Sequence, residues 1–194
     1  MALERDAELM LRVKEGDDSS FAVLLDRYRV PVIHFIYRMV QNQHVAEELA
    51  QDVFLRVYKA RKGYEPSAKF TTWLFRIATH IALNAIRDGR GERTVESMDG
   101  EESSALQIPD RRLNVEQVLL EDARLNEIRR AVQALPAKQR AAVLMHKYQE
   151  MDYAQIAQVL GCSESAVKSL LFRAYETLRR KLAHFAGVPQ TARQ

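Results

Sequence analysis

Residues 151–182, MDYAQIAQVLGCSESAVKSLLFRAYETLRRKL, contain two helical patterns separated by a tight turn. Asp152 is a good N-cap for a short first helix. We expect Ile156, Ala157 and Leu160 of that helix to face inward. Gly161 can adopt the left-handed conformation that a tight turn needs, and Ser163 can cap the second helix. The pattern is typical of a helix-turn-helix, which we expect over about residues 152–173.

The second helix of this motif has one apolar face and one basic face. The apolar face consists of Val167, Leu171, Ala174, Leu178 and Leu182. The N-terminal half of the opposite face carries long donors and small hydroxyl groups, and its residues are Ser165, Lys168, Ser169, Phe172 and Arg173. Such side chains can enter the major groove of DNA and donate to base edges and phosphates. We therefore expect these five residues to bind DNA. The alternative is an ordinary pair of helices with a solvated basic face.

Helical spacing of apolar residues continues through most of the 194-residue chain and predicts an all-α protein of two small helical domains. We expect helices over about 6–14, 20–40, 45–61, 72–88, 115–134, 137–149, 152–160 and 164–185. Pro31 should bend or break the second of these. Residues 93–112 are rich in glycine, serine and charged groups, and they predict a flexible acidic linker. Residues 186–194 should form a disordered tail.

The composition favours a protein that binds a polyanion and argues against a metal protein or an enzyme. The net charge is only +3, but residues 129–194 carry eleven basic and four acidic side chains, which suits a polyanionic partner. A lone cysteine, Cys162, excludes an internal disulfide and a cysteine zinc site. The histidines are scattered, and no phosphate loop or nucleophile motif is present. We expect no metal, no cofactor and no enzymatic activity. Without a signal sequence or a membrane-length apolar run, the chain is expected to be cytoplasmic.

Two segments of the first half carry less specific signals. Residues 64–87, YEPSAKFTTWLFRIATHIALNAIR, combine aromatic and basic groups at a loop–helix junction, which suits unstacked bases of single-stranded DNA. The alternative is core packing, which we favour for Trp73. Residues 45–60, VAEELAQDVFLRVYKA, have an acidic and amide face beside an apolar one. These residues alone fit either a solvated helix face or a docking surface for a partner helix.

Four blocks in order resemble a known family: GDDSSFAVLLDRY, AEELAQDVFLRVYKA, KFTTWLFRIATHIALNAIR and LPAKQRAAVLMHKYQEMDYAQIAQVLGCSESAVKSLLFRAYETLRRKL. They resemble the extracytoplasmic-function (ECF) sigma factors, the sigma-E-like two-domain relatives of sigma-70. The resemblance covers about residues 6–185. It implies sigma-70 region 2 at 6–92, with a core-binding motif at about 48–61, and region 4 at 113–185.

This resemblance implies a function and a set of partners. The chain would direct core RNA polymerase to specific promoters, in a stress or envelope response, under the control of an anti-sigma factor. The alternative is a stand-alone helix-turn-helix transcriptional regulator, which would need no polymerase. The core enzyme would bind through the clamp helices of its β′ subunit and through its β subunit, without insertion of the chain into a membrane.

The resemblance also assigns site residues. Those expected to bind core polymerase are Glu48, Gln51, Asp52, Phe54 and Leu55. Those expected to bind the −10 promoter element are Lys69, Phe70, Thr71, Thr72, Trp73, Arg76, His80 and Asn84. The −35 element would be bound by the five residues of the basic helix face described above.

Overall fold

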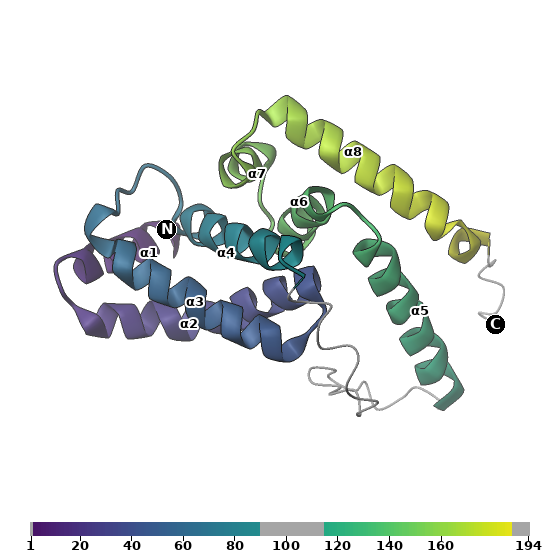
Figure 1. Ribbon diagram of the computed structural model, residues 1–194, viewed down its shortest axis with the longest axis horizontal. Coiled ribbons are helices and arrows are strands. Elements are labelled where there is room, and N and C mark those ends of the chain that lie inside the picture. Colours follow the sequence, from purple (N-terminus) through teal and green to yellow (C-terminus); the bar gives the residue numbers. More distant parts are fainter. Residues whose placement is uncertain (1, 90–114, 188–194) are drawn as a thin grey trace.

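The computed structural model describes residues 2–89 and 115–187, which form two groups of helices (Figure 1). The first group contains α1 (Ala2–Lys14), α2 (Asp18–Val40), α3 (Gln43–Ala60), the 3₁₀ turn η1 (Arg61–Gly63) and α4 (Phe70–Arg87). The second contains α5 (Val115–Gln133), α6 (Ala137–Tyr148), α7 (Tyr153–Leu160), α8 (Glu164–Lys181) and the 3₁₀ turn η2 (Ala183–Gly187). No strand occurs in these ranges, and the predicted all-α, two-domain class is confirmed. The predicted linker, 93–112, and residues 188–194 of the predicted tail lie outside the described residues.

Short polar side chains set the starts of the helices in the first domain. At the start of α2, the Asp17 carboxylate accepts hydrogen bonds from the backbone N–H groups of Ser19 and Ser20. At the start of α3, the Asn42 side chain accepts from the N–H of Val45 at 3.0 Å. These caps satisfy donors that have no partner inside the helix. The Asn42 cap places the turn between α2 and α3, and the two helices pack side by side.

We expected Pro31 either to bend or to break the second helix. Helix α2 runs without interruption through Pro31, so the helix is not broken there. Proline removes one backbone donor and crowds the carbonyl four residues earlier. Both halves of α2 are nevertheless held by packing, since Leu24 on one side and Phe35 and Met39 on the other are buried. Two helix boundaries differ by about four residues from those expected. Helix α1 begins at Ala2 rather than near Asp6, and α8 ends at Lys181 rather than near residue 185. The turn η2 then includes residues 186 and 187, which were expected to belong to the tail.

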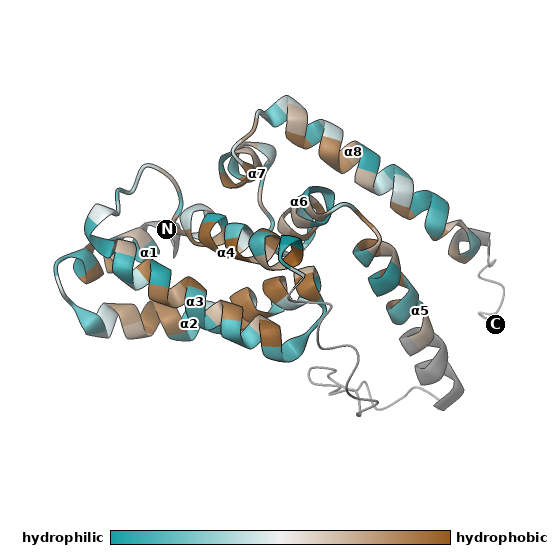
Figure 2. Cartoon of the chain, in the orientation of Figure 1, coloured by the Kyte–Doolittle hydropathy of each residue, from teal (hydrophilic) through white to brown (hydrophobic). Residues whose placement is uncertain are grey.

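The first domain is built on α2, α3 and α4, which contact one another, with α1 packed against α2. In Figure 2, hydrophobic and hydrophilic stretches alternate along these helices, as expected for helices that bury one face. The largest fully buried side chains of this core are Tyr64, Phe35, Phe70 and Phe75. The rings of Phe35 and Phe75 meet edge to face, with centroids 5.3 Å apart.

The second domain packs α6, α7 and α8 against one another, while α5 makes fewer contacts and meets the first domain at its C-terminal end, where Gln133 donates to the backbone oxygen of Arg38 (Figure 1). Its buried side chains include Leu144, Ile156, Val159, Val167 and Leu171. The two domains also touch. Helices α6 and α7 contact α4, and α6 contacts the end of α2, so the buried apolar residues of both domains form one continuous cluster.

Candidate nucleic-acid and partner surfaces

The helix-turn-helix is formed by the local interactions that its sequence predicts. Asp152 and Gln155 form a capping box, each side chain accepting from the backbone N–H of the other at 2.8 and 3.0 Å. Gly161 ends α7 in the left-handed conformation, with φ of +63°. The Ser163 hydroxyl then accepts from the N–H of Ala166 at the start of α8. The caps that begin and end these helices at the turn are therefore all supplied by residues of the motif itself.

The outward face of α8 presents one continuous surface. An open depression on this face is lined by the five residues predicted to bind the −35 element, Ser165, Lys168, Ser169, Phe172 and Arg173. All five are exposed, and Phe172 is 70% exposed although it is aromatic. The opposite face of α8, with Val167, Leu171 and Ala174, is buried. The helix thus uses its apolar face for docking on α6 and α7, and its polar face is left open to a ligand.

An aromatic group lies beside this surface and was not predicted. The His146 ring stacks on Tyr153 with centroids 5.7 Å apart, and its Nδ1 lies 3.0 Å from the hydroxyl of Tyr175. The Lys168 ammonium lies 5.9 Å from the centre of the Tyr153 ring, within reach of a cation–π interaction. Burial, and secondarily Tyr153, raises the pKa of Tyr175. The three side chains come from α6, α7 and α8. The sequence shows that these aromatic residues are present, but it does not indicate that they contact one another.

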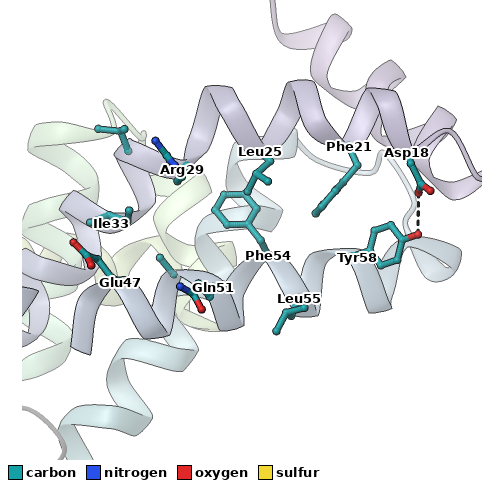
Figure 3. A pocket seen from close by; sticks show the side chains of 12 residues that line it. Asp18, Phe21, Leu25, Arg29, Ile33, Glu47, Gln51, Phe54, Leu55 and Tyr58 are labelled. Atoms are coloured by element: carbon teal, nitrogen blue, oxygen red, sulfur yellow. Dashed lines mark hydrogen bonds between the residues drawn. The ribbon is translucent and has the colours of Figure 1, made fainter. Parts of the chain in front are cut away.

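A second surface is a groove between α2 and α3 (Figure 3). Its lining consists of Asp18, Phe21, Leu25, Arg29, Val30, Ile33, Glu47, Ala50, Gln51, Phe54, Leu55 and Tyr58. Three of the five residues predicted to bind core polymerase belong to this lining: Gln51, Phe54 and Leu55. The other two, Glu48 and Asp52, are exposed on the same helix but do not line the groove.

The groove has an apolar floor and polar ends. Phe54 is 7% exposed and points toward Leu25, while Leu55 is 55% exposed and points away from α2 (Figure 3). The Phe21 and Tyr58 rings meet edge to face at 5.1 Å. The Tyr58 hydroxyl donates to Asp18 at 2.8 Å, and this bond is the main cause that raises its pKa. Apolar anchors with a polar rim suit a partner helix.

Sequence reasoning missed the contribution of α2 to this groove, because it assigned partner binding to α3 alone. The sequence could have indicated this contribution, because the apolar stripe on α2 is wider than a single buried helix face requires. Leu25 and Ile33 are only half-buried, and Val30 is exposed. The basic side chain of Arg29 adds a charge to this wall of the groove.

The residues predicted to bind the −10 element divide into three groups on and before α4. Four are exposed: Lys69, Arg76, His80 and Asn84. Thr71 and Trp73 are half-buried, and Phe70 and Thr72 are buried. The four exposed residues give this end of the first domain hydrogen-bond donors and positive charge. The structure does not present the Phe70 ring to a ligand.

Phe70 instead belongs to an aromatic cluster at the start of α4. Its ring centroid lies 5.4 Å from that of Tyr28, 6.4 Å from that of Tyr64 and 6.1 Å from that of Trp73. Tyr64 and Trp73 also meet edge to face at 5.0 Å. Trp73 thus packs on two rings while it keeps part of its surface open. Core packing was the role favoured for Trp73 from sequence, and the cluster shows that it does pack.

Comparison with known proteins identifies the family. Residues 24–92 match the model of sigma-70 region 2, and residues 125–178 match that of sigma-70 region 4. Over 177 residues the chain is 30% identical to the ECF RNA polymerase sigma factor SigW of Bacillus subtilis, which covers 88% of this chain and 93% of that protein. The chain belongs to the ECF sigma factors of the sigma-70 family. It therefore directs core RNA polymerase to promoters to initiate transcription.

Other relatives and solved structures match this chain over most of its length. This sigma factor is 30% identical to the RNA polymerase sigma-H factor of Pseudomonas aeruginosa over 92% of its length and 94% of that protein. Its fold resembles two solved structures. The first is CnrH in complex with the cytosolic domain of CnrY, with a TM-score of 0.69, 20% identity and coverage of 93% and 98% of the two chains. The second is RpoE in complex with the anti-sigma factor NepR from Bartonella quintana, with a TM-score of 0.62, 22% identity and coverage of 84% and 96%.

These matches do not favour a stand-alone helix-turn-helix regulator, because such a protein would account for the second domain only. Among residues 2–89 and 115–187, no helix is long and apolar enough to cross a membrane. Within the same ranges, no three side chains of His, Cys, Asp or Glu gather as they would to hold a metal ion.

Proposed function

We propose that the two domains of this sigma factor divide its three binding tasks. Region 2, residues 6–92, binds core polymerase through the α2–α3 groove and the −10 element through α4. Region 4, residues 113–185, binds the −35 element through the outer face of α8, and residues 93–112 connect the two. The observation that carries this proposal is that the residues expected to bind −35 DNA form one open surface on α8.

The groove supports the assignment of polymerase binding. Its floor offers an apolar anchor point at Phe54 and an exposed leucine at Leu55, and interface energy concentrates at such anchors. Gln51 adds hydrogen-bonding capacity on the same wall. Glu48 and Asp52 lie beside the groove and add negative charge, which favours a positively charged partner helix. A coiled pair of helices, as in the β′ clamp, fits this shape and chemistry.

The exposed side chains of α4 support the assignment of −10 binding. Lys69 and Arg76 supply positive charge for phosphates, while His80 and Asn84 can exchange hydrogen bonds with base edges. The open part of Trp73 offers a surface on which an unstacked base can lie. In this proposal Phe70 supports Trp73 from within the aromatic cluster and does not itself touch DNA.

We further propose that the protein has no catalytic activity of its own and acts in the cytoplasm, where polymerase and promoters meet. Its surfaces supply binding energy and position the promoter, and the polymerase performs the chemistry. CnrH and RpoE were solved with CnrY and with an anti-sigma factor, respectively. By analogy, an anti-sigma factor controls this chain, in a stress or envelope response. Affinity purification from unstressed cells should recover such a partner, and recovery of polymerase alone would count against it.

Run-off transcription with purified components tests the main proposal. Purified core polymerase and this chain are mixed with genomic fragments that chromatin sequencing shows to be bound by both. A transcript that starts at one position and needs the added chain is the expected result. Transcription that is equal with and without the chain on every fragment would reject the proposal. A fragment with a scrambled −10 element serves as the matched control.

A further inference from the structure

Helix α1 carries a buried carboxylate that none of the three proposed binding surfaces uses. Asp6 is 4% exposed, although an acidic side chain is almost never buried to this extent unless it is paired. Both of its oxygens have partners in α2: the Arg27 guanidinium donates to Oδ1, and the Tyr28 hydroxyl donates to Oδ2. Helix α1 also lies before residues 24–92, which match sigma-70 region 2. The match with that region therefore does not account for Asp6.

The ring of Tyr28 connects this carboxylate to the start of α4. Its centroid lies 5.4 Å from that of Phe70, the first residue of α4, and the Phe70 ring lies 6.1 Å from that of Trp73 in the first turn of the same helix. Phe70 is 1% exposed, whereas Trp73 keeps part of its surface open. Burial, and after it the bond to Asp6, raises the pKa of Tyr28, so its hydroxyl remains a donor. A carboxylate in α1 thus holds the ring against which α4 begins.

The first turn of α4 depends on this packing because it has no local cap. The starts of α2, α3, α7 and α8 are each capped by a side chain, but Lys69, at the corresponding position before α4, makes no such hydrogen bond. Side-chain caps satisfy the free N–H groups of a helix start and help to set its position. Where a cap is missing, packing against the rest of the domain sets that position instead. For α4 this packing comes from the rings around Phe70.

The other end of α1 holds the segment that leads into α4. Lys14 Nζ donates to the backbone oxygen of Tyr64 at 2.9 Å. Tyr64 begins the segment 64–69 between η1 and α4, and its buried ring meets that of Trp73 with centroids 5.0 Å apart. Positions 65, 66, 67 and 69 of this segment are exposed. The segment is therefore fixed at both ends and open between them.

We propose that α1 positions the −10 surface of this sigma factor. Asp6 acts on the start of α4 through the ring of Tyr28, and Lys14 acts on segment 64–69 through its backbone. Together they hold in place the side chains at this junction that are proposed to bind DNA. Asp6 and Lys14 are positioning residues, and neither is assigned a contact with DNA. The inference rests on the proposed role of α4 and Lys69 in −10 binding.

Fixing these side chains before DNA arrives favours binding. A ligand that meets an ordered site does not bear the entropic cost of ordering it, and the side chains of a binding site need a supporting layer that locks their rotamers. A hydrogen bond to a charged carboxylate is stronger than one between neutral groups, so Asp6 is a firm anchor for Tyr28. Loss of this bond leaves the Tyr28 ring packed in the cluster but free to tilt, and Phe70 and Trp73 tilt with it.

Two tyrosines of the same cluster provide a matched test. Tyr28→Phe removes the hydroxyl that Asp6 holds, while Tyr64→Phe removes a hydroxyl that has no hydrogen-bond partner within the described part of the chain. Each variant is assembled with core polymerase, and its affinity for the single-stranded −10 segment of a mapped promoter is measured by fluorescence anisotropy of the labelled oligonucleotide. Tyr28→Phe should weaken this binding at least about threefold, and Tyr64→Phe should leave it unchanged. Equal affinities in the two variants would overturn the proposal.

A second measurement on the same variants separates positioning from a general loss of structure. Neither tyrosine lines the α2–α3 groove, so the affinity for core polymerase should be the same in both variants and in the unaltered chain. A parallel loss of core binding and −10 binding in Tyr28→Phe would show that the hydroxyl supports the whole domain, and it would overturn a role specific to the −10 surface.

A double-mutant cycle tests whether Asp6 acts through Tyr28. Asp6→Ala should weaken −10 binding about as much as Tyr28→Phe, and the double variant should be no weaker than Asp6→Ala alone, since both changes break the same hydrogen bond. Arg27→Met removes the other partner of the carboxylate. It should lower stability, because it leaves a buried charge without its counter-charge, but it should not change −10 binding. Additive losses in the double variant would overturn the role of Asp6.

The fluorescence of Trp73, the single tryptophan of the chain, reports on the cluster directly. Time-resolved anisotropy of the free chain is measured at a temperature where circular dichroism shows the variants to be folded. It should detect additional fast motion of this ring in Tyr28→Phe and none in Arg27→Met. A loss of stability alone does not produce this difference. Equal motion of Trp73 in the two variants would overturn the proposal.

Lys14 is tested against a neighbouring charge on α1. Lys14→Met removes the bond to the backbone of Tyr64, and Arg12→Met removes the same charge from an exposed position of the same helix. Lys14→Met should weaken −10 binding at least about twofold more than Arg12→Met, as expected for the loss of one hydrogen bond. Equal effects would show that Lys14 acts only through its charge and would overturn its positioning role.

A variant of α4 itself distinguishes failure of this inference from failure of the proposed function. Arg76 is exposed on α4 and is proposed to contact DNA directly. If Arg76→Ala weakens −10 binding but Tyr28→Phe and Asp6→Ala do not, α4 binds DNA and the positioning role of α1 is rejected. If Arg76→Ala also leaves binding unchanged, the assignment of −10 binding to α4 is rejected, and the inference about α1 is rejected with it.

Discussion

Arg140, near the start of α6, donates a hydrogen bond to the backbone oxygen of Met39 at the end of α2, 101 positions earlier in the chain. The same guanidinium donates to the backbone oxygens of Gln133 and Leu135, which border the turn between α5 and α6. One half-buried side chain thus binds three carbonyl groups in two domains. The planar arginine fork, with its five donors, suits this geometry.

Replacement of Arg140 by methionine should lower the free energy of unfolding by about 2 kcal/mol or more, because it leaves buried carbonyl groups without a charged donor. Arg140→Lys should be intermediate, since an ammonium group cannot reach all three oxygens at once. Urea unfolding followed by circular dichroism measures the effect. Lys138→Met, at an exposed position of the same helix, is the matched control. An equally large loss in that control would show that Arg140 has no special role.

Leu55→Asp should weaken binding to core polymerase by about tenfold or more, which corresponds to about 1.4 kcal/mol. The exposed leucine is expected to become buried against the partner, and a carboxylate there would be desolvated without a counter-charge. Because Leu55 is 55% exposed in the free chain, stability should change by less than about 0.5 kcal/mol.

The same charge placed elsewhere on α3 controls for net charge in this experiment. Ala60→Asp introduces it at an exposed position that does not line the groove. Fluorescence anisotropy with labelled sigma factor and core enzyme gives the two affinities. If both variants lost affinity to the same extent, the groove would not be the binding site.

Lys168→Ala and Arg173→Ala should each weaken promoter binding by about tenfold while core binding stays unchanged, because both side chains line the open surface of α8. Filter binding of the assembled holoenzyme to a promoter fragment, at several salt concentrations, measures the loss. A residue that contacts phosphate should also reduce the salt slope by about one. Arg129→Ala removes an exposed charge from α5 and should have little effect. Loss of core binding in either α8 variant would contradict the assignment.

The parts of this structure that the sequence predicts best are those that depend on neighbouring residues. The caps Asp152 and Ser163 and the left-handed Gly161 satisfy backbone groups within a few positions, so their roles follow from residue type. Helical periodicity likewise predicted the apolar face of α8 and, by exclusion, its exposed polar face. For this reason the sequence indicated which five side chains share the exposed face of α8, and their binding to the −35 element stays a prediction.

The parts that sequence reasoning missed depend on contacts between distant residues. Nothing local indicates that Thr72 pairs with Gln155, which lies 83 positions away. The continuity of α2 at Pro31 and the contribution of Leu25 to the groove also arise from packing, which overrides local propensity. The burial of Phe70 was missed because an aromatic residue beside basic ones has the same sequence pattern whether it stacks on a base or on other rings.

Tyr64→Phe should leave stability unchanged or raise it by up to about 1 kcal/mol. The Tyr64 hydroxyl is buried, with no hydrogen-bond partner within the described part of the chain. Burial, with a smaller effect of Asp6, raises its pKa. Removal of an unpaired buried polar group removes its desolvation cost. Tyr28→Phe is the matched comparison, since the Tyr28 hydroxyl donates to Asp6, and it should lose about 1 kcal/mol. Thermal unfolding measures the stability of both variants. A larger loss of stability in Tyr64→Phe than in Tyr28→Phe would contradict this account.

Asp17→Asn should remove a pH-dependent part of stability in acid. Hydrogen bonds from the Ser19 hydroxyl, then from the Ser20 hydroxyl and backbone, lower the pKa of Asp17 from 3.8 to about 2. Because the folded state holds the carboxylate more strongly in its ionised form, this contribution is complete above the unfolded pKa near 4. It is lost as the pH falls toward 2. Asparagine keeps a capping oxygen but has no charge. Urea unfolding should therefore show a stability difference between the two proteins that is constant from pH 7 to 5 and shrinks from pH 4 to 2. A difference that stays constant down to pH 2 would show that the charge of Asp17 contributes nothing to the start of α2.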